Sequence, residues 1–478
     1  MSNRVQADLP NILICMADDQ GPWAMHCAGT PELITPTLDR LASEGTRFEN
    51  CFCASPVCSP ARASFLTGRI PSYHGIHDWL RSGNIDVEDG VTGRGKDRAI
   101  EYLAGLTAFT DVLARNGYLC GFSGKWHLGA SGTPQKGHTY WCAYSLGGGS
   151  YTNYHYFDNR PELTHSTQYV TDLFTDRAVQ FLDRYGRGGA PFCLSVHYTA
   201  PHSPWLESEQ PPDVWRLYDG CAFDSLPVLP PHPWHGWNPS PEDRRTTVHG
   251  YFTTITAMDR AIGRILDKLD ELGIAGNTLM FFTSDNGFNV GHHGVLGKGN
   301  ATYPLNMFEE SVKVPFIVRC PNRIPAGALR PELVSHYDFM PTLLDYLGIE
   351  NPIADELPGR SFASLLRGEA GGRDTVVVHD EYGPVRMIRD RHWKYVHRYP
   401  CGPHELYCLA EDPPETVNRV NDLTCRETLE RLRHGLDEWF QKYAQPDKDG
   451  ALLPVTGKGQ IDAVGSGRTG RAAFAPYQ

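Results

Sequence analysis

Three short apolar runs that each end in polar residues constrain the fold of this chain more than any other feature. The runs and the polar residues that follow them are 11–17 with Asp18 and Asp19, 191–198 with His202, and 278–283 with Asp285 and Asn286. A continuous apolar run bounded by polar residues is typical of a strand buried on both faces of a parallel sheet. We therefore expect neighbouring parallel strands that carry their polar residues to one edge of the sheet.

Helical periodicity separates these runs. It predicts helices over 35–44, 107–116, 169–185 and 247–272. Strands that alternate with helices indicate an α/β fold, in which helices cover both faces of a large, mostly parallel sheet. With 478 residues, of which 40% are hydrophobic, the chain is long enough for one large core and a smaller unit.

The pattern changes after residue 372. Three segments, 375–379, 385–389 and 393–398, predict short antiparallel strands, and a helix is expected over 427–443. We therefore divide the chain into a large N-terminal domain, a smaller α+β subdomain and a Gly-, Ala- and Arg-rich tail that we expect to be extended or mobile. Their ranges are 1–372, 373–456 and 457–478.

Composition excludes several classes of protein. The net charge of -12 argues against a nucleic-acid-binding surface, and no apolar run is long enough to cross a membrane. Thirteen scattered cysteines indicate reduced thiols, and Cys51 and Cys53 lack a second pair of zinc ligands. Residues 1–9 do not read as a signal peptide, so we expect the cytoplasm, or the periplasm or secretion if a signal was removed. The oligomeric state stays open.

Hard oxygen donors gather at the predicted edge of the sheet. Asp18, Asp19, Asp285 and Asn286 offer three carboxylates and an amide, the ligands that calcium or magnesium prefers. The alternative is local: an Asp-Asp pair after a strand can cap a helix, and Asp-Asn-Gly can form a turn.

The segment Cys58-Ser59-Pro60-Ala61-Arg62 predicts a helix N-terminus. We expect Ser59 as its N-cap, Pro60 at its first position and Gly68 at its end. There the free backbone N–H groups favour an oxyanion, and Arg62 is placed to add a bidentate contact. The alternative is an ordinary capped helix with a buried thiol.

These motifs resemble those of type I, formylglycine-dependent sulfatases of the alkaline phosphatase superfamily. Further similar segments follow in family order: Lys125-Trp126-His127, Ala200-Pro201-His202, Gly297-Lys298-Gly299 and Leu406-Tyr407. The resemblance implies an alkaline-phosphatase-like fold and a sulfuric ester hydrolase that releases inorganic sulfate. The sequence departs from the family in two places. Residue 61 is Ala where many members have Ser, and the segment 303–315 lacks the Tyr-Glu-Gly-Gly pattern of arylsulfatases.

The resemblance also implies the nucleophile and its metal. A formylglycine-generating enzyme would oxidise Cys58 to formylglycine, whose hydrated aldehyde attacks the sulfur. A divalent metal, usually calcium, would be held by Asp18, Asp19, Asp285 and Asn286 and would touch residue 58.

The remaining roles are carried over in the same way. Lys125, Lys298 and Arg62 would balance charge on the sulfate oxygens, and Asp285 would take the proton of the attacking hydroxyl. His202, with Lys298, would protonate the leaving alcohol, and His127 would take the second proton so that sulfate leaves.

For the substrate we expect a sulfated carbohydrate rather than a simple aryl or choline sulfate. His74 and Asp78 follow the signature helix and are placed to reach a sugar, or else cap and pack. Aromatic residues that would rim the pocket, half of them alternatively core, are Trp79, Tyr151, Tyr154, Trp205, Trp234 and Trp237. His397, Arg398 and His404 are expected to contact the rest of the substrate.

Two other functions compete with the sulfatase interpretation. Phosphonate or phosphate ester hydrolases of the same superfamily tend to carry Asp-His-Gly at the second metal motif, whereas this chain has Asp285-Asn286-Gly287. If Cys58 stays a thiol, the chain would bind sulfated glycans without cleaving them. Every expected catalytic position is filled, which favours the enzyme.

Overall fold

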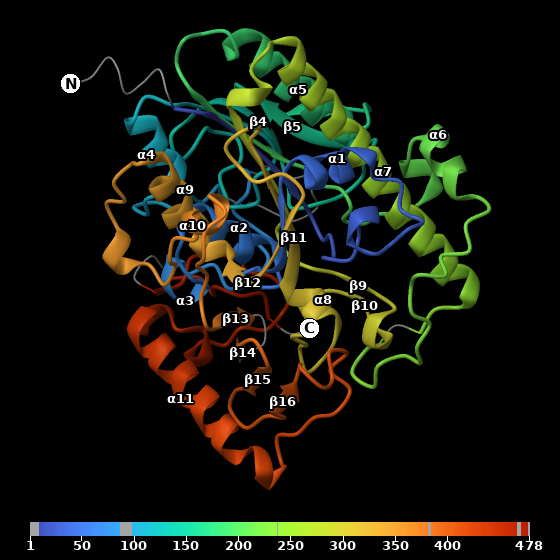
Figure 1. Ribbon diagram of the computed structural model, residues 1–478, viewed down its shortest axis with the longest axis vertical. Coiled ribbons are helices and arrows are strands. Elements are labelled where there is room, and N and C mark those ends of the chain that lie inside the picture. The colour runs from blue at the N-terminus through green and yellow to red at the C-terminus, as the bar shows by residue number, and fades with distance from the viewer. Residues whose placement is uncertain (1–8, 87–97, 237, 381–383, 466–469, 477–478) are drawn as a thin grey trace.

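The computed structural model of the protein describes residues 9–86, 98–236, 238–380, 384–465 and 470–476 (Figure 1). A ten-stranded mixed sheet forms its centre. In spatial order its strands are β12 (Ala328–Ser335), β2 (Thr46–Phe52), β11 (Lys313–Arg319), β8 (Thr278–Ser284), β1 (Asn11–Ala17), β7 (Phe192–His197), β3 (Leu119–Lys125), β4 (His138–Tyr144), β5 (Tyr154–Asp158) and β6 (Thr164–Ser166).

The three strands predicted from the apolar runs are adjacent. β1 lies between β8 and β7 and is parallel to both, so the polar residues after all three strands meet at one edge. The sheet is nevertheless mixed, because β11 runs antiparallel to β2 and β8, and β5 and β6 form an antiparallel edge. The predicted fold class is confirmed, with these antiparallel strands added.

Helices cover both faces of the sheet, and β1 shows why. Ile12, Ile14 and Met16 enter one core, whereas Leu13 and Cys15 enter the other. The first core holds α2 (Cys58–Thr67), α4 (Phe109–Arg115) and α9 (Phe339–Leu347), and the second holds α1 (Pro36–Glu44), α5 (Val170–Tyr185) and α7 (Pro241–Glu271). A strand with apolar residues at every position requires two such layers.

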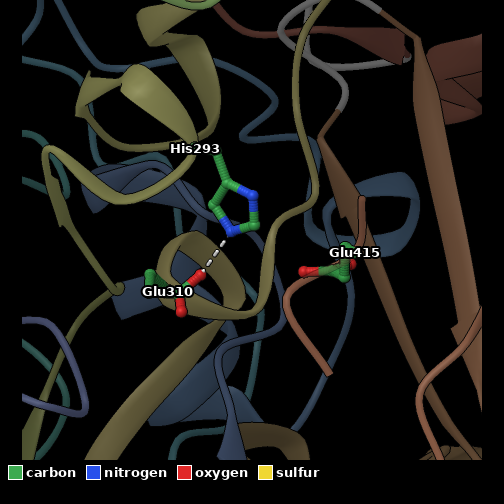
Figure 2. Close-up of side chains that lie close together, drawn as sticks. All are labelled: His293, Glu310 and Glu415. Carbon is green, nitrogen blue, oxygen red and sulfur yellow. Dashed lines mark hydrogen bonds and ion pairs between the residues drawn. The ribbon is translucent and has the colours of Figure 1, made fainter. Parts of the chain in front are cut away.

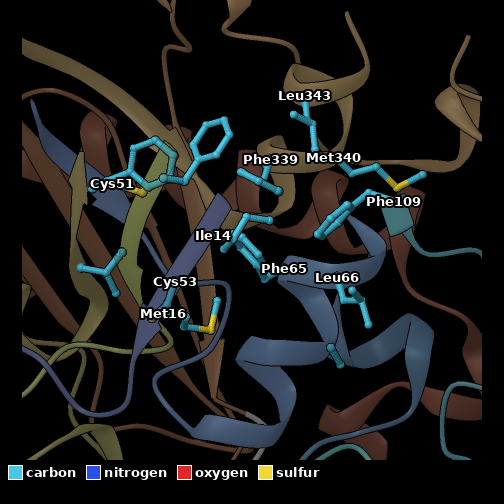
Figure 3. Close-up of a cluster of buried hydrophobic side chains, with 14 of the residues drawn as sticks. Ile14, Met16, Cys51, Cys53, Phe65, Leu66, Phe109, Phe339, Met340 and Leu343 are labelled. Carbon is cyan, nitrogen blue, oxygen red and sulfur yellow. The ribbon is translucent and has the colours of Figure 1, made fainter. Parts of the chain in front are cut away.

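Helix α2 carries the signature and is anchored in the first core (Figure 3). The ring of Phe65 stacks on that of Phe339 from α9, with their centroids 4.2 Å apart. The helix begins at Cys58 and ends at Gly68, which has a left-handed φ of 68°. The prediction of Ser59 as N-cap is wrong: Val57 holds that position, and the Ser59 hydroxyl instead accepts a hydrogen bond from Leu80 N.

Helix α7 begins six residues before its predicted start at residue 247. Its first turn is polar and therefore lacks the apolar periodicity, but Ser240 caps it by accepting a hydrogen bond from Asp243 N (3.1 Å). The remaining short elements are α3 (Pro71–His74), α6 (Pro212–Trp215), α8 (Glu309–Val312), α10 (Ala363–Leu366), β9 (Asn289–Val290) and β10 (Leu296–Gly297).

A second, antiparallel sheet lies at one end of the molecule, covered by α11 (Figure 1). It consists of β13 (Val376–Asp380), β14 (Val385–Arg389), β15 (Trp393–Arg398) and β16 (Glu405–Cys408), and α11 spans Arg426–Tyr443. The three predicted strands and the helix are present, and β16 adds a fourth strand. Buried ion pairs join this unit to α8: Glu309 binds Arg389 and Lys394, and Lys394 also binds Glu415 (2.6 Å). We call these four residues the junction cluster.

The described part of the tail packs against the segment that follows α3. Val464 and Phe474 are buried in a small apolar cluster of the tail, and Gln460 is completely buried. All thirteen cysteines lie in the described residues and are free thiols. Within the described ranges, no helix has the length and apolar character needed to cross a bilayer.

Candidate active site

Three buried carboxylates meet where β1 and β8 end. Oxygen atoms of Asp18, Asp19 and Asp285 lie within 4.8 Å of one another. Each carboxylate has its own cation. Lys125 binds Asp18, Lys298 Nζ lies 2.5 Å from Asp19 Oδ1, and Arg62 Nε lies 2.9 Å from Asp285 Oδ2. We call the three acids, with Asn286, the carboxylate cluster.

This cluster fits a divalent cation. Asp18 Oδ1 is buried and accepts no hydrogen bond from the described residues. Burial, together with the charge of Asp285, raises the pKa of Asp18 to about 8. Asn286 Nδ2 donates to Asp19 Oδ1 (2.8 Å), which brings its amide to the same point. A hard cation would neutralise this repulsion and use the free oxygen.

Arg62 lies beneath the carboxylates. It is 2% exposed, and Nη1 donates to the Lys125 carbonyl (2.9 Å) while Nε binds Asp285. Although burial opposes ionisation, Arg62, Lys125 and Lys298 hold the pKa of Asp285 below its usual range. A bidentate contact of Arg62 with a bound oxyanion stays a prediction; in this structure the guanidinium binds Asp285 and the Lys125 carbonyl, and Arg62 is not among the residues that line the pocket.

A pocket of about 300 Å³ opens above the cluster. Its lining combines the signature cysteine, two histidines, a lysine and small residues: Val57, Cys58, Trp79, Leu80, His127, Leu146, Gly147, Gly148, His202, Lys298 and Asn300. Lys125 is fully buried, pairs with Asp18 and is not among the residues that line the pocket. Four of the predicted catalytic side chains, Cys58, His127, His202 and Lys298, thus share one cavity.

His127 is oriented toward Cys58. Its Nε2 lies 3.0 Å from the Leu80 carbonyl, and because a carbonyl oxygen can only accept a hydrogen bond, Nε2 carries the hydrogen. Nδ1 then presents its lone pair to Cys58 Sγ, 3.4 Å away. Burial lowers the pKa of His127 well below its usual value, so the ring is neutral. The left-handed φ angles of His127 (54°) and Asp19 (66°) mark backbone strain of the kind that gathers at functional sites.

His202 and Lys298 both approach the carboxylate of Asp19. His202 Nε2 lies 3.8 Å from Asp19 Oδ2, and its Nδ1 lies 2.8 Å from the Ser203 carbonyl. Burial lowers the pKa of His202 to about 4. Burial also disfavours the charged form of Lys298, but the charge of Asp19 outweighs it and raises the pKa of Lys298, so this ammonium keeps its proton.

Comparison with known proteins decides the family. A family model described as Sulfatase matches residues 10–349, and one described as N-sulphoglucosamine sulphohydrolase, C-terminal, matches residues 303–442. The chain belongs to the sulfatase family. It is a sulfuric ester hydrolase, and the members of this family generally use formylglycine and a divalent metal.

This sulfatase resembles several characterised relatives. It is 26% identical to an N-acetylglucosamine-6-O-sulfatase of Bacteroides thetaiotaomicron, over 92% of this chain and 88% of that protein. A solved structure in complex with its substrate D-glucosamine-2-N,6-O-disulfate superimposes with a TM-score of 0.76 at 24% identity, covering 93% of this chain and 99% of the other. A phosphonate monoester hydrolase of Agrobacterium radiobacter shares the fold at a TM-score of 0.63 and 20% identity, over 90% and 95% of the two chains.

His74 and Asp78, which were predicted either to reach a sugar or to cap and pack, do not line the pocket. His74 is 4% exposed and is hydrogen-bonded to Ser64 Oγ and Ile76 N (both 3.1 Å). Asp78 is fully buried and accepts hydrogen bonds from the main chain of Trp79 and Gly459. Both residues cap and pack behind the pocket wall, which was the local alternative.

The predicted aromatic rim of the sulfatase is divided between pocket and core. Trp79 lines the pocket, and Trp234 lines a neighbouring cavity. Tyr151, Tyr154 and Trp205 pack on other rings, and Trp237 lies outside the described residues.

His397, Arg398 and His404 are held in the C-terminal unit. The Arg398 guanidinium is bound by the Leu305 carbonyl (2.7 Å), and His397 stacks on His404.

Two glycines are part of the site although no motif named them. A Cβ atom at Gly147 would lie 2.2 Å from His127 Nε2, and one at Gly148 would lie 3.2 Å from His202 Cε1. Both histidines therefore pack directly on this loop. The run of three glycines at 147–149 is a signal of close backbone approach that sequence inspection alone offers.

A second group of ionisable side chains, His293, Glu310 and Glu415, shares Glu415 with the junction cluster (Figure 2). His293 Nε2 and Glu310 Oε2 are 2.8 Å apart, while Glu415 is held by Lys394. The side chains that could bind a metal here are therefore already paired, His293 with Glu310 and Glu415 with Lys394.

Proposed function

We propose that this sulfatase cleaves a sulfate ester of a carbohydrate, with residue 58, once converted to formylglycine, as its nucleophile. The observation that carries this proposal is the position of Cys58: it lines the pocket with Lys298 and His202, and His127 presents a lone pair to it. A group at position 58 is thus placed to meet an anionic substrate at a helix N-terminus.

The shape of the cavity supports a substrate larger than a sulfated alcohol. A second cavity of about 430 Å³ shares Asn300 with the first and is lined by Trp234, Tyr303 and Lys458. Tyr303 is 75% exposed, and aromatic faces of this kind stack on sugar rings. The relatives that act on sulfated glucosamine support the same class.

For the metal we propose calcium, held by Asp18, Asp19, Asp285, Asn286 and residue 58. When bound, this ion supplies positive charge that polarises the sulfate and lowers the pKa of the attacking hydroxyl. Arg62 keeps Asp285 ionised and oriented, so that this carboxylate is available to hold the cation.

Side chains in and behind the pocket supply the proton transfers and the charge balance of the reaction. Lys298, which keeps its proton, faces the pocket beside Asp19 and donates to the leaving alcohol, and His202 lines the pocket next to it. His127 takes a proton from residue 58 at Nδ1, because Nε2 is committed to Leu80. Lys125 offsets negative charge from behind Asp18.

The test is to co-express the chain with a formylglycine-generating enzyme and to examine the Cys58 peptide by mass spectrometry. We expect the aldehyde, release of sulfate from a sulfated glucosamine, and loss of that activity in Cys58→Ala. The matched control is Cys53→Ala, which removes another buried thiol and should retain turnover.

Two results would overturn the proposal. A strong preference for an aryl phosphonate over the corresponding aryl sulfate would assign the protein to its phosphonate-cleaving relatives. A persistent thiol at position 58, with binding of sulfated glycans and no hydrolysis, would make it a binding protein.

A further inference from the structure

The C-terminal tail reaches the wall of the active-site pocket through Gln460. Gln460 N donates to the Trp79 carbonyl (2.8 Å), and its own carbonyl accepts from Arg81 N (2.9 Å). The two bonds bracket Leu80, which pairs with Gln460 as in a parallel two-stranded ladder. Trp79 and Leu80 both line the pocket, so the tail backs this part of its wall.

The side chain of Gln460 locks this pairing in place. It is completely buried, and Nε2 donates to the carbonyls of Gly75 (2.9 Å) and Asp462 (3.0 Å). Oε1 accepts from His77 N (2.9 Å). A buried amide with all three of these bonds satisfied is rigid, since any shift would leave polar groups unpaired.

Leu80 in turn connects the tail to the reacting residues. Its N–H donates to Ser59 Oγ (3.1 Å), next to the nucleophile position, and its carbonyl accepts from His127 Nε2 (3.0 Å). That carbonyl decides which nitrogen of His127 keeps a proton. A displaced carbonyl would free the ring to rotate or to change tautomer, and Nδ1 would no longer face residue 58.

Gly459 brings the tail equally close to Trp79. Its φ is 98°, and a Cβ atom there would lie 3.1 Å from the Trp79 ring and 2.8 Å from Arg81 Cβ. The tail backbone therefore touches both neighbours of Leu80, with no side chain between them.

We propose that Gln460 is a positioning residue of the sulfatase reaction: it holds the Leu80 carbonyl, which fixes His127 in the tautomer that accepts a proton from residue 58. This inference rests on the proposed function, because Gln460 is proposed to act only by positioning His127, and the role of His127 is part of that function. The tail is thus a working part of the active site, and its effect is on turnover rather than on substrate binding.

The test compares Gln460→Ala, and the near-isosteric Gln460→Met in case the smaller side chain impairs folding, with the control Val464→Ala. Val464 is buried in the same tail but has no contact with Leu80 among those described. For each full-length variant, kcat and KM are measured on a sulfated glucosamine and normalised to the formylglycine fraction found by mass spectrometry. Gln460→Ala should lower kcat about ten- to a hundred-fold with KM within about two-fold, the size expected for a catalytic group misplaced by about 1 Å. Val464→Ala should leave kcat unchanged.

A double-mutant cycle with His127→Ala separates positioning from general loss of structure. If Gln460 acts through His127, then Gln460→Ala in the His127→Ala background changes kcat by less than about two-fold, because coupled residues are not additive. Equal fold-losses in both backgrounds, or an unchanged kcat in Gln460→Ala and Gln460→Met, would overturn the inference. A wild-type chain without sulfatase activity would instead overturn the proposed function.

Discussion

The carboxylate cluster and the junction cluster are both buried sets of acids and bases, yet they serve different ends. In the junction cluster Lys394 binds Glu309 and Glu415, and Arg389 binds Glu309. Each charged group is therefore paired with another member of the cluster. In the carboxylate cluster each acid also has a cation, but one of these cations, Lys298, lines the pocket together with Cys58. The comparison shows that charge balance alone does not mark an active site; ionised groups that also line a pocket do.

The largest expected difference between the two clusters is in catalysis. Asp285→Asn keeps the shape of the side chain but removes the charge that Arg62 orients, and it should lower kcat by about 10³-fold or more. Glu415→Gln is the matched change in the junction cluster and should leave kcat per folded molecule within about two-fold. Steady-state turnover of a sulfated sugar by both purified variants checks this. Equal losses in the two variants would mean that the junction cluster also serves the reaction.

For the free energy of unfolding, we expect a large effect from a change in the junction cluster. Lys394 is completely buried and binds Glu309 (3.1 Å) and Glu415 (2.6 Å). Lys394→Met removes the ion pair of Glu415 and leaves Glu309 with Arg389 and the more distant Lys313, so it should lower the free energy of unfolding by about 3–5 kcal/mol. Lys442→Met on the exposed face of α11 is the control. Urea unfolding followed by circular dichroism measures both, and a Lys394→Met protein as stable as the control would show that the junction pairs contribute nothing net.

Metal binding should distinguish the carboxylate cluster from the second group of ionisable residues, His293, Glu310 and Glu415. Removal of calcium with a chelator should abolish turnover, and its return should restore turnover and stabilise the fold by about 2.7 kcal/mol at a hundred times the dissociation constant. Calorimetric unfolding with and without calcium measures this shift. It should disappear in Asp18→Asn and persist in Glu310→Gln, and the opposite pattern would place the ion beside the junction cluster.

The smallest expected effect is a pH dependence of stability from the junction cluster. Burial raises the pKa of Glu415 from 4.5 to about 7 against the pull of Lys394. Between these values the folded protein holds more protons than the unfolded chain, so the free energy of unfolding should fall as the pH rises from 4.5 to 7. Glu415→Gln should remove this component of the slope in urea titrations at several pH values. An identical slope in both proteins would show that Glu415 titrates normally.

Much of the framework was predictable because its causes are local. The apolar runs of β1, β7 and β8 predicted their burial, and their polar ends predicted one shared edge, which the strand order confirms. The start of α7 was missed because its first turn is polar, and β16 was missed because four residues carry too little periodicity.

The direction of individual side chains was less predictable. Arg62, His74 and Asp78 follow the nucleophile position closely in sequence, yet none of them lines the pocket. Each is bound by a partner that local sequence does not reveal, namely Asp285, Ser64 and Gly459. The glycines at 147 and 148 became part of the site only when β4 placed their loop against His127 and His202.

The sequence by itself determined the chemistry of this protein: apolar strands with acidic ends, a signature helix with its cysteine, and the lysines and histidines of a sulfatase. Strand periodicity and helix boundaries arise within a few residues, so they can be read without a structure. The tertiary structure alone decided which of these groups face the pocket, which of them hold their neighbours, and that the tail returns to support Leu80. Those outcomes depend on contacts between distant segments, where packing and hydrogen-bond satisfaction, rather than local preference, set the direction of each side chain.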